Sequence, residues 1–243
     1  MKAALVVNKV KSSREENMKD ILMYIKMAGE HKADLVVFPE AAVTGLCLSD
    51  NPLTDINLGL SEDSYEIRDL CSSAKNNNLN LAIGILEKDN GKLYDSALFI
   101  NRNGKIALKY RRISSGWRDS NQETIYKEGS EINFLETEFG TICFLICGDL
   151  FDEKLVSHVK DLNINILLFP FARSFCHGTD IKEKWQKEAF KEYVEQIKKS
   201  NTVTLAVNCL DEDYFGGAFA LNKDGSIISY FDIGQEGMFW VDL

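Results

Sequence analysis

A thiol and a carboxylate each follow directly on an apolar run of this sequence. Cys147 comes after residues 141–146, and Glu40 comes after Val-Val-Phe-Pro at 36–39. Short runs rich in β-branched and aromatic residues indicate buried strands. Ligands bind beyond the carboxyl ends of strands in open α/β sheets. Both side chains are therefore candidates for one site, although a buried structural cysteine and a solvated loop glutamate are the plainer alternatives.

The chemistry that these two groups offer is nucleophilic attack by sulfur. A free thiol titrates near pH 8.5, so attack at neutral pH needs an adjacent base or cation. Partial burial at the end of an apolar strand would raise the pKa of Glu40 and suit it to accept the proton of Cys147. Backbone N–H groups around Gly148 and Asp149 would then face the developing oxyanion.

Two basic residues in the strand expected at 105–112 are candidates for a cation at this site. Arg112 lies at the end of that strand and Lys109 lies three residues earlier. Three is an odd step, which directs the two side chains to opposite faces of an extended strand. At most one of them is therefore expected to point at the crevice beside Cys147.

The order of the expected elements is that of a mixed α/β protein. Hairpin turns are expected at Asn90-Gly91 and Asn103-Gly104. The one domain expected over residues 1–243 would be two sheets packed face to face with helices outside. Helices are expected at 12–29, 64–75, 153–160 and 181–199. Strands are expected at 3–7, 33–38, 80–86, 95–101, 105–112, 132–138, 141–146, 164–169, 202–208, 217–222 and 226–230, which is taken as the last.

Composition restricts the partners of the chain. Its 243 residues carry a net charge of -9 with a pI near 5.0, which disfavours nucleic acid and anionic membranes as partners. No apolar run approaches the roughly 18 residues that span a bilayer, and the start lacks the features of a secretory signal. A cytoplasmic protein is expected. The six cysteines show no CxxC spacing, so neither a zinc site nor a disulfide framework is indicated.

Four motifs together resemble the carbon-nitrogen hydrolase (nitrilase) superfamily. They are Phe38-Pro39-Glu40, Tyr110-Arg111-Arg112, Cys147-Gly148-Asp149 and Phe215-Gly216-Gly217, in that order along the chain. The resemblance implies a four-layer αββα sandwich that forms a homodimer or a larger homo-oligomer. It also implies a Glu-Lys-Cys triad that uses no metal or cofactor.

The resemblance assigns roles to individual residues. Glu40 matches the general base, Cys147 the nucleophile, and Glu123, in the polar loop 113–131, the second glutamate that positions the triad and the substrate. Trp185 and Asn208 are weaker matches, and Trp185 is taken as a candidate substrate contact with Gly148 and Asp149. At the third triad position this chain has Arg112 where the family has lysine, and arginine does not readily give up a proton. Leu-Phe-Asp-Glu at 150–153 also departs from the family's usual turn.

The function expected from these residues is hydrolysis of a small-molecule amide through a thioester on Cys147. Arg112 would stabilise the oxyanion. Because Arg112 replaces the family lysine, a non-catalytic binding protein of the same fold is the second hypothesis. An unrelated α/β enzyme that pairs Cys147 with His177 is the third. The sequence does not identify the substrate or decide among amide, nitrile and carbamoyl chemistry.

Overall fold

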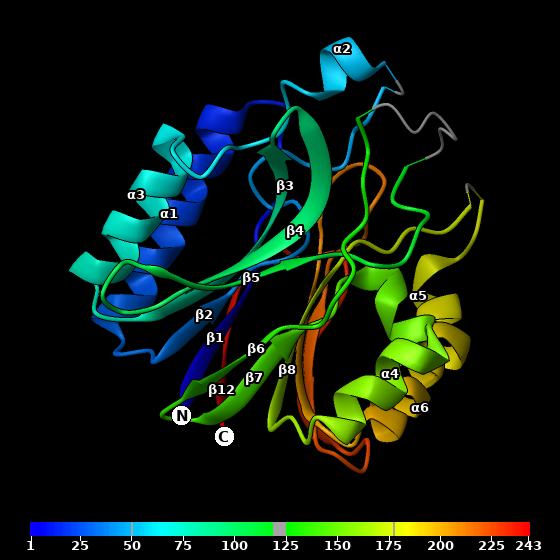
Figure 1. Ribbon diagram of the computed structural model, residues 1–243. Helices are drawn as coiled ribbons and strands as arrows, with labels where there is room; N and C mark the ends of the chain where they lie inside the picture. Colours follow the sequence, from blue (N-terminus) through cyan, green and yellow to red (C-terminus); the bar gives the residue numbers. More distant parts are fainter. Residues whose placement is uncertain (50, 119–124, 177) are drawn as a thin grey trace.

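The computed structural model describes residues 1–49, 51–118, 125–176 and 178–243. Two six-stranded sheets lie face to face, and helices cover the outer face of each (Figure 1). In the order helix, sheet, sheet, helix, these are the four layers expected from the sequence, so the predicted αββα sandwich is confirmed.

The first sheet has parallel strands at its centre and antiparallel strands at both sides. The strands β1, β2 and β3 run parallel, and β4, β5 and β12 are antiparallel to their neighbours. In spatial order the strands are β12 (Gly237–Asp242), β1 (Lys2–Val7), β2 (Leu35–Val37), β3 (Asn80–Asp89), β4 (Lys92–Ile100) and β5 (Ile106–Arg111).

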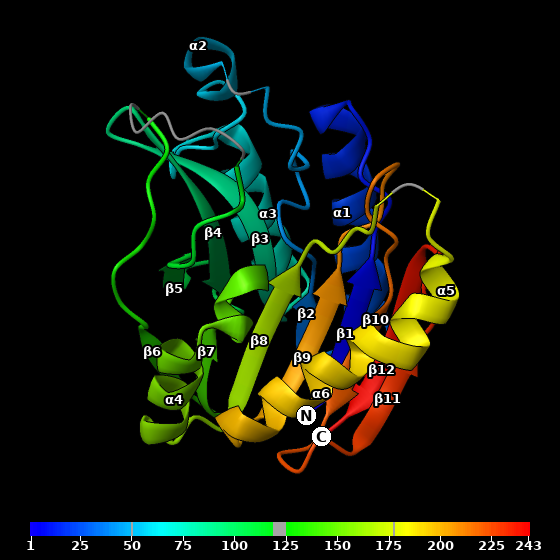
Figure 2. The same ribbon diagram turned by 90° about the vertical axis from the view of Figure 1, so that its right-hand side faces the viewer.

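The second sheet repeats this plan. Its central strands β7, β8 and β9 are parallel, and the outer strands are antiparallel to their neighbours (Figure 2). In spatial order the strands are β11 (Ile227–Phe231), β10 (Ala218–Leu221), β9 (Val203–Asn208), β8 (Ile166–Phe171), β7 (Gly140–Phe144) and β6 (Phe134–Thr137).

Two helices cover the first sheet, and a second group covers the other sheet (Figure 1). The first group is α1 (Arg14–Glu30) and α3 (Tyr65–Asn76), and the second is α4 (Glu153–Asp161), α5 (Ile181–Lys184) and α6 (Phe190–Ser200). The short helix α2 (Pro52–Asp55) lies apart from both. Serine side chains cap α1 and α3, where Ser13 accepts from Glu16 N at 3.3 Å and Ser64 from Ile67 N at 3.4 Å. No helix within the described ranges is long and apolar enough to cross a membrane.

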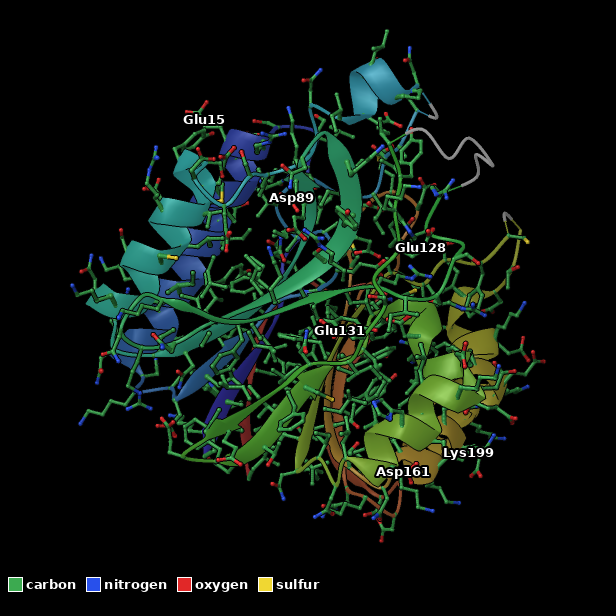
Figure 3. All side chains as sticks on the ribbon, in the orientation of Figure 1. Glu15, Asp89, Glu128, Glu131, Asp161 and Lys199 are labelled. Atoms are coloured by element: carbon green, nitrogen blue, oxygen red, sulfur yellow. The ribbon has the colours of Figure 1, made fainter. Side chains whose placement is uncertain are left out.

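Strand β1 shows how the sequence separates the two interfaces of its sheet. Leu5 and Val7 belong to the core between the sheets, and Ala4 and Val6 pack with the residues of α1 and α3. Side chains alternate across a strand, so a continuous apolar run serves both faces at once. Charged side chains lie on the outer side of the helical layers, as Glu15 and Lys199 do in Figure 3.

Besides the unexpected short helices at Pro52–Asp55 and Cys147–Phe151, two elements differ from the sequence expectation. Strand β12 was not expected, yet Gly237–Asp242 pairs along the whole of β1. Its partner strand lies at the other end of the chain, and local patterns do not report such pairing. The helix expected at 181–199 is present as three segments, because a π-helical turn (Trp185–Ala189) separates α5 from α6.

Candidate active site

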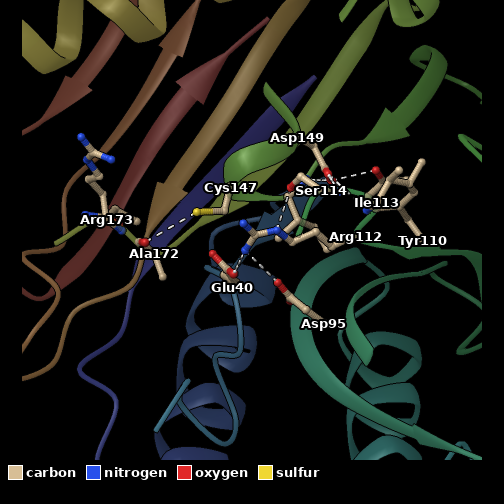
Figure 4. A network of polar contacts seen from close by, with 12 residues as sticks. Glu40, Asp95, Tyr110, Arg112, Ile113, Ser114, Cys147, Asp149, Ala172 and Arg173 are labelled. Carbon is tan, nitrogen blue, oxygen red and sulfur yellow. Dashed lines mark hydrogen bonds and ion pairs between the residues drawn. The ribbon is translucent and has the colours of Figure 1, made fainter. Parts of the chain in front are cut away.

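Glu40, Arg112 and Cys147 converge at one edge of the stacked sheets. Glu40 follows β2, Arg112 follows β5 and Cys147 follows β7. Figure 4 shows the three side chains pointing toward one another. Arg112 Nη1 lies 3.1 Å from Glu40 Oε1, and the charge of Cys147 contributes to raising the pKa of the Glu40 carboxyl. The carboxyl ends of strands in two different sheets thus bring an acid, a cation and a thiol to one place.

The turn that carries Glu40 is pressed against β3. A Cβ at Gly84 would lie 2.5 Å from Glu40 Cα and 2.6 Å from Pro39 O, closer than real Cβ atoms approach. Gly84 O also accepts a hydrogen bond from Ala42 N at 3.0 Å. Glycine at position 84 therefore lets the chain bury the Glu40 side chain completely.

Cys147 is held in an unusual backbone conformation. Its φ is +46°, in the left-handed region that costs a residue with a side chain roughly 1–2 kcal/mol. It begins a 3-10 helix (Cys147–Phe151), and Sγ lies 3.6 Å from the carbonyl oxygen of Ala172 after β8. The thiol is half-buried. Strained backbone conformations of this kind are frequent at functional sites. Here the positive φ directs the side chain away from the direction of the preceding strand.

The guanidinium of Arg112 links the groups of the site. Nη1 contacts both Glu40 Oε1 and Asp95 Oδ2, the latter at 3.3 Å, and Nε donates to Ser114 Oγ at 3.0 Å. Nη2 makes no hydrogen bond to a described residue, and a Cβ at Gly148 would lie 2.7 Å from it. Burial disfavours the charge, but the nearby carboxylates outweigh it and raise the pKa of Arg112. The group therefore stays cationic.

Asp95 is a member of the site that the sequence reasoning missed. It lies on β4, is 1% exposed, and its carbonyl oxygen accepts a hydrogen bond from Arg112 N at 2.8 Å. The signal was present in the hairpin at Asn103-Gly104. Its register places Ser96 opposite Arg111, and therefore Asp95 beside Arg112.

The Glu40 carboxyl has the electrostatics of a base. Burial, and then the negative charge of Asp95, raise its pKa well above the ordinary value, and the opposing effect of Arg112 is smaller. A carboxylate with a raised pKa holds a proton more strongly and suits the transfer of a thiol proton near neutral pH.

The structure gives Asp149 a different place from the one expected. Its N–H donates to Ile146 O at 3.0 Å and is therefore not directed at an oxyanion. Its side chain accepts four hydrogen bonds, from Ile113 N at 3.1 Å, Ser114 N at 2.6 Å, Tyr110 Oη at 2.7 Å and Ile146 N at 3.0 Å. Asp149 is therefore not the substrate contact that the sequence suggested. Its carboxylate is a structural bracket, a group that joins the segment around the end of β5 to the turn at Cys147 by hydrogen bonds.

Lys109 lies outside the site, as strand parity predicted. Its Nζ pairs with Glu87 Oε1 at 2.9 Å, whereas Arg112 points into the space between the sheets. The other strand cysteine, Cys143, is fully buried, and burial raises the pKa of its thiol to about 12. Neither side chain competes with Arg112 or Cys147 for the roles proposed.

Two residues taken from the resemblance serve packing and loop geometry. Trp185 is 2% exposed and packs among Phe171, Tyr193, Phe215 and Phe219, and its Nε1 donates to Tyr230 Oη at 2.9 Å. The structure thus places Trp185 in the aromatic core and not on a surface that a substrate contacts. Asn208 accepts from Arg173 N at 2.7 Å and donates to Gly216 O at 2.8 Å, which joins two loops beside the site. Glu123 and His177 lie outside the described residues.

The chain belongs to the carbon-nitrogen hydrolase family, whose model matches residues 2–243. The resemblance that the four motifs indicated is therefore confirmed. Amidases and nitrilases are among the proteins that this chain resembles, and the chain spans between about two fifths and three fifths of the length of the first curated relatives it matches.

Solved structures and curated proteins resemble this chain to different extents. The carbon-nitrogen hydrolase from Helicobacter pylori G27 has a TM-score of 0.86 at 19% identity, covering 99% of this chain and 88% of the other. The NitN amidase from Nesterenkonia sp. AN1 has a TM-score of 0.82 at 15% identity, covering 100% and 92%. Deaminated glutathione amidase from Dictyostelium discoideum is 27% identical over 183 residues, which are 66% of this chain and 60% of that protein. The likeness of the two structures is a likeness of fold.

Proposed function

We propose that this chain hydrolyses the C–N bond of a small-molecule amide through a thioester on Cys147. The observation that carries the proposal is the convergence of a buried carboxyl, a permanent cation and a half-buried thiol at one edge of the sheets. Amidases among the similar proteins support the choice of amides.

The first half of the reaction forms the thioester. Glu40 accepts the thiol proton of Cys147 as sulfur bonds to the amide carbonyl carbon, and the carbonyl oxygen gains negative charge. Arg112 Nη2, which no described residue occupies, is the donor we assign to that oxygen. The C–N bond then breaks, and the amine leaves with the proton from Glu40. A single donor of this kind typically changes the barrier by about 3–4 kcal/mol.

The second half regenerates the thiol. Glu40 takes a proton from water as the water oxygen attacks the thioester carbon, and Arg112 again faces the oxyanion. The C–S bond breaks, the sulfur recovers the proton held by Glu40, and a carboxylic acid leaves. One water and one amide therefore give one acid and one amine, and every proton passes through Glu40.

Arginine at position 112 is compatible with this scheme because no step requires the cation to lose a proton. Its planar fork allows Nη1 to hold the carboxylates while Nη2 faces Gly148. A lysine has one nitrogen for both tasks. We therefore assign Arg112 to oxyanion stabilisation and Glu40 to proton transfer.

Replacement of Cys147 tests the proposal. Ammonia release is measured from a panel of short aliphatic, aromatic and dicarboxylic amides, and the unaltered protein is expected to turn over at least one of them. Cys147→Ala should abolish that turnover, and Glu40→Gln should lower it by roughly 10²–10⁴-fold, because every proton transfer of the scheme passes through Glu40. Cys71→Ala, on the far helix α3, is the control and should retain activity. Ammonia release that persists in Cys147→Ala would refute the assignment of the nucleophile.

A further inference from the structure

Two buried carboxylates share the guanidinium of Arg112. Nη1 lies 3.1 Å from Glu40 Oε1 and 3.3 Å from Asp95 Oδ2, and both carboxylates are almost fully buried. With one positive and two negative groups, full ionisation would leave a net charge buried, which is costly. The reaction proposed above uses Glu40 and Arg112 and gives no task to Asp95.

If Glu40 were paired with Arg112 alone, its carboxylate would be a poor base. An opposite charge in contact favours the ionised carboxylate and weakens its hold on a proton. Asp95 weakens this effect of Arg112 because it contacts the same guanidinium nitrogen and adds a second negative charge beside Glu40. Glu40 Oε2 and Asp95 Oδ1 are both buried and make no hydrogen bond to a described residue. Either oxygen can therefore carry a proton without displacing a described hydrogen-bond partner.

Asp95 contacts Arg112 through its backbone as well as through its side chain. It lies inside β4, and its own carbonyl oxygen accepts from Arg112 N at 2.8 Å as the ladder between β4 and β5 ends. The arginine is thus tied to Asp95 at its backbone and at its side chain. A guanidinium held in this way keeps Nη2 beside Gly148 while Glu40 gains and loses its proton.

We propose that Asp95 is a positioning residue for the hydrolysis assigned above: it anchors Arg112 and leaves Glu40 able to accept the thiol proton. In the absence of the Asp95 charge, Arg112 would pair with Glu40 alone and hold it ionised to lower pH. The electrostatics agree, because the Asp95 charge raises the pKa of Glu40. Other titratable and charged groups around the pair also interact with it electrostatically: Tyr110, Arg112, Cys147, Asp149, Tyr193, Cys209 and Tyr214.

The test is the pH dependence of Cys147 alkylation, which requires no substrate. Iodoacetamide is added from pH 5 to 9, and peptide mass spectrometry follows the modification of Cys147 separately from the exposed Cys176. In the unaltered protein the alkylation rate of Cys147 should rise with pH, and this rise is called the acid limb. Asp95→Asn should move the acid limb to lower pH by about one unit or more. It should lower the rate above the limb roughly two- to fivefold, since a weaker base takes the proton less readily.

A matched control lies on the same hairpin. Asp89 pairs with Arg111 at 2.8 Å but lies on the opposite side of the sheet from the site, and Asp89→Asn should leave the Cys147 profile unchanged. If Asp95→Asn lowers the rate equally at every pH and the limb stays in place, Asp95 is a structural residue and the proposal is overturned. Asp95→Glu, which keeps the charge, should bring the limb back toward that of the unaltered protein.

An independent measurement decides the case if Asp95→Asn does not fold. Infrared titration of the unaltered protein should show a protonated carboxyl that persists well above the ordinary glutamate range near pH 4.3, and Glu40→Gln should remove it. Absence of such a band above pH 5.5 overturns the proposal. A shifted limb without any amide turnover would instead refute the proposed function alone, and turnover with an unshifted limb would refute the role of Asp95 alone.

Discussion

Replacement of Asp149 by asparagine should destabilise the fold strongly, although it changes only one atom of the side chain. Both carboxylate oxygens accept two hydrogen bonds each, and all four donors belong to other residues. An amide offers one oxygen and one NH2 group. Wherever the NH2 lies, it faces at least one backbone N–H that has then lost its acceptor.

The side-chain amide of the variant will adopt the less costly of its two orientations, and this orientation determines the loss of stability. With NH2 at the position of Oδ2, the Tyr110 hydroxyl can rotate and accept from it, so one bond, from Ile146 N, is lost outright. A buried donor without a partner costs about 1–3 kcal/mol. The bonds from Ile113 N and Ser114 N also lose the strength that a charged acceptor gives, which adds roughly 0.5–1.5 kcal/mol each. Asp149→Asn should therefore reduce the free energy of unfolding by about 2–6 kcal/mol.

Urea denaturation followed by tryptophan fluorescence and circular dichroism measures this change. Asp152→Asn is the matched control: Asp152 caps α4 through one oxygen, which accepts from Lys154 N at 2.8 Å, and asparagine caps a helix about as well. It should cost only a few tenths of a kcal/mol. A free energy of unfolding for Asp149→Asn within 1 kcal/mol of the unaltered protein would show that the bracket between β5 and β7 contributes little, and would refute the reasoning.

Two further changes test how the site and its sheet are held. Gly84→Ala places a methyl group against the backbone of the Glu40 turn, so it should cost roughly 1–3 kcal/mol or more in urea denaturation and slow amide turnover with it. Glu87→Gln should destabilise the protein at pH 7, because Glu87 pairs with Lys109 and Arg111. These partners lower the pKa of Glu87 to about 2 despite its burial, so its contribution is complete above about pH 4.5 and is lost as the pH falls through 2. The difference in stability between the two proteins should shrink over that interval; a constant difference would contradict the role of the ion pairs.

The sequence predicted those parts of the site that depend on strand ends and strand parity. Glu40 and Cys147 follow apolar runs, and such runs end at the edge where the structure places both residues. The odd step between Lys109 and Arg112 separated the two cations correctly, since a period of two needs no knowledge of neighbouring strands.

The parts that were missed depend on contacts between distant segments. Asp95 is a single acid in an ordinary strand, and its importance appears only when the register of the hairpin brings it beside Arg112. The structural role of Asp149 is not visible in the sequence because three of its four donors, Tyr110, Ile113 and Ser114, come from a segment that the local pattern does not connect to it. The substrate contact expected at Trp185 fails for the same reason, because its neighbours Phe171 and Phe219 come from β8 and β10, which precede and follow it in the chain. Strand β12 needed the first strand of the chain for its pairing.

The positive φ of Cys147 means that the residue proposed as nucleophile also lowers the stability of the fold. Glycine adopts that conformation freely, so a glycine at position 147 would relieve a cost of roughly 1–2 kcal/mol while removing the sulfur. Laboratory evolution for thermal resistance alone would therefore tend to discard the reactive group. Laboratory evolution of a more thermostable variant must therefore select for amide turnover in every round.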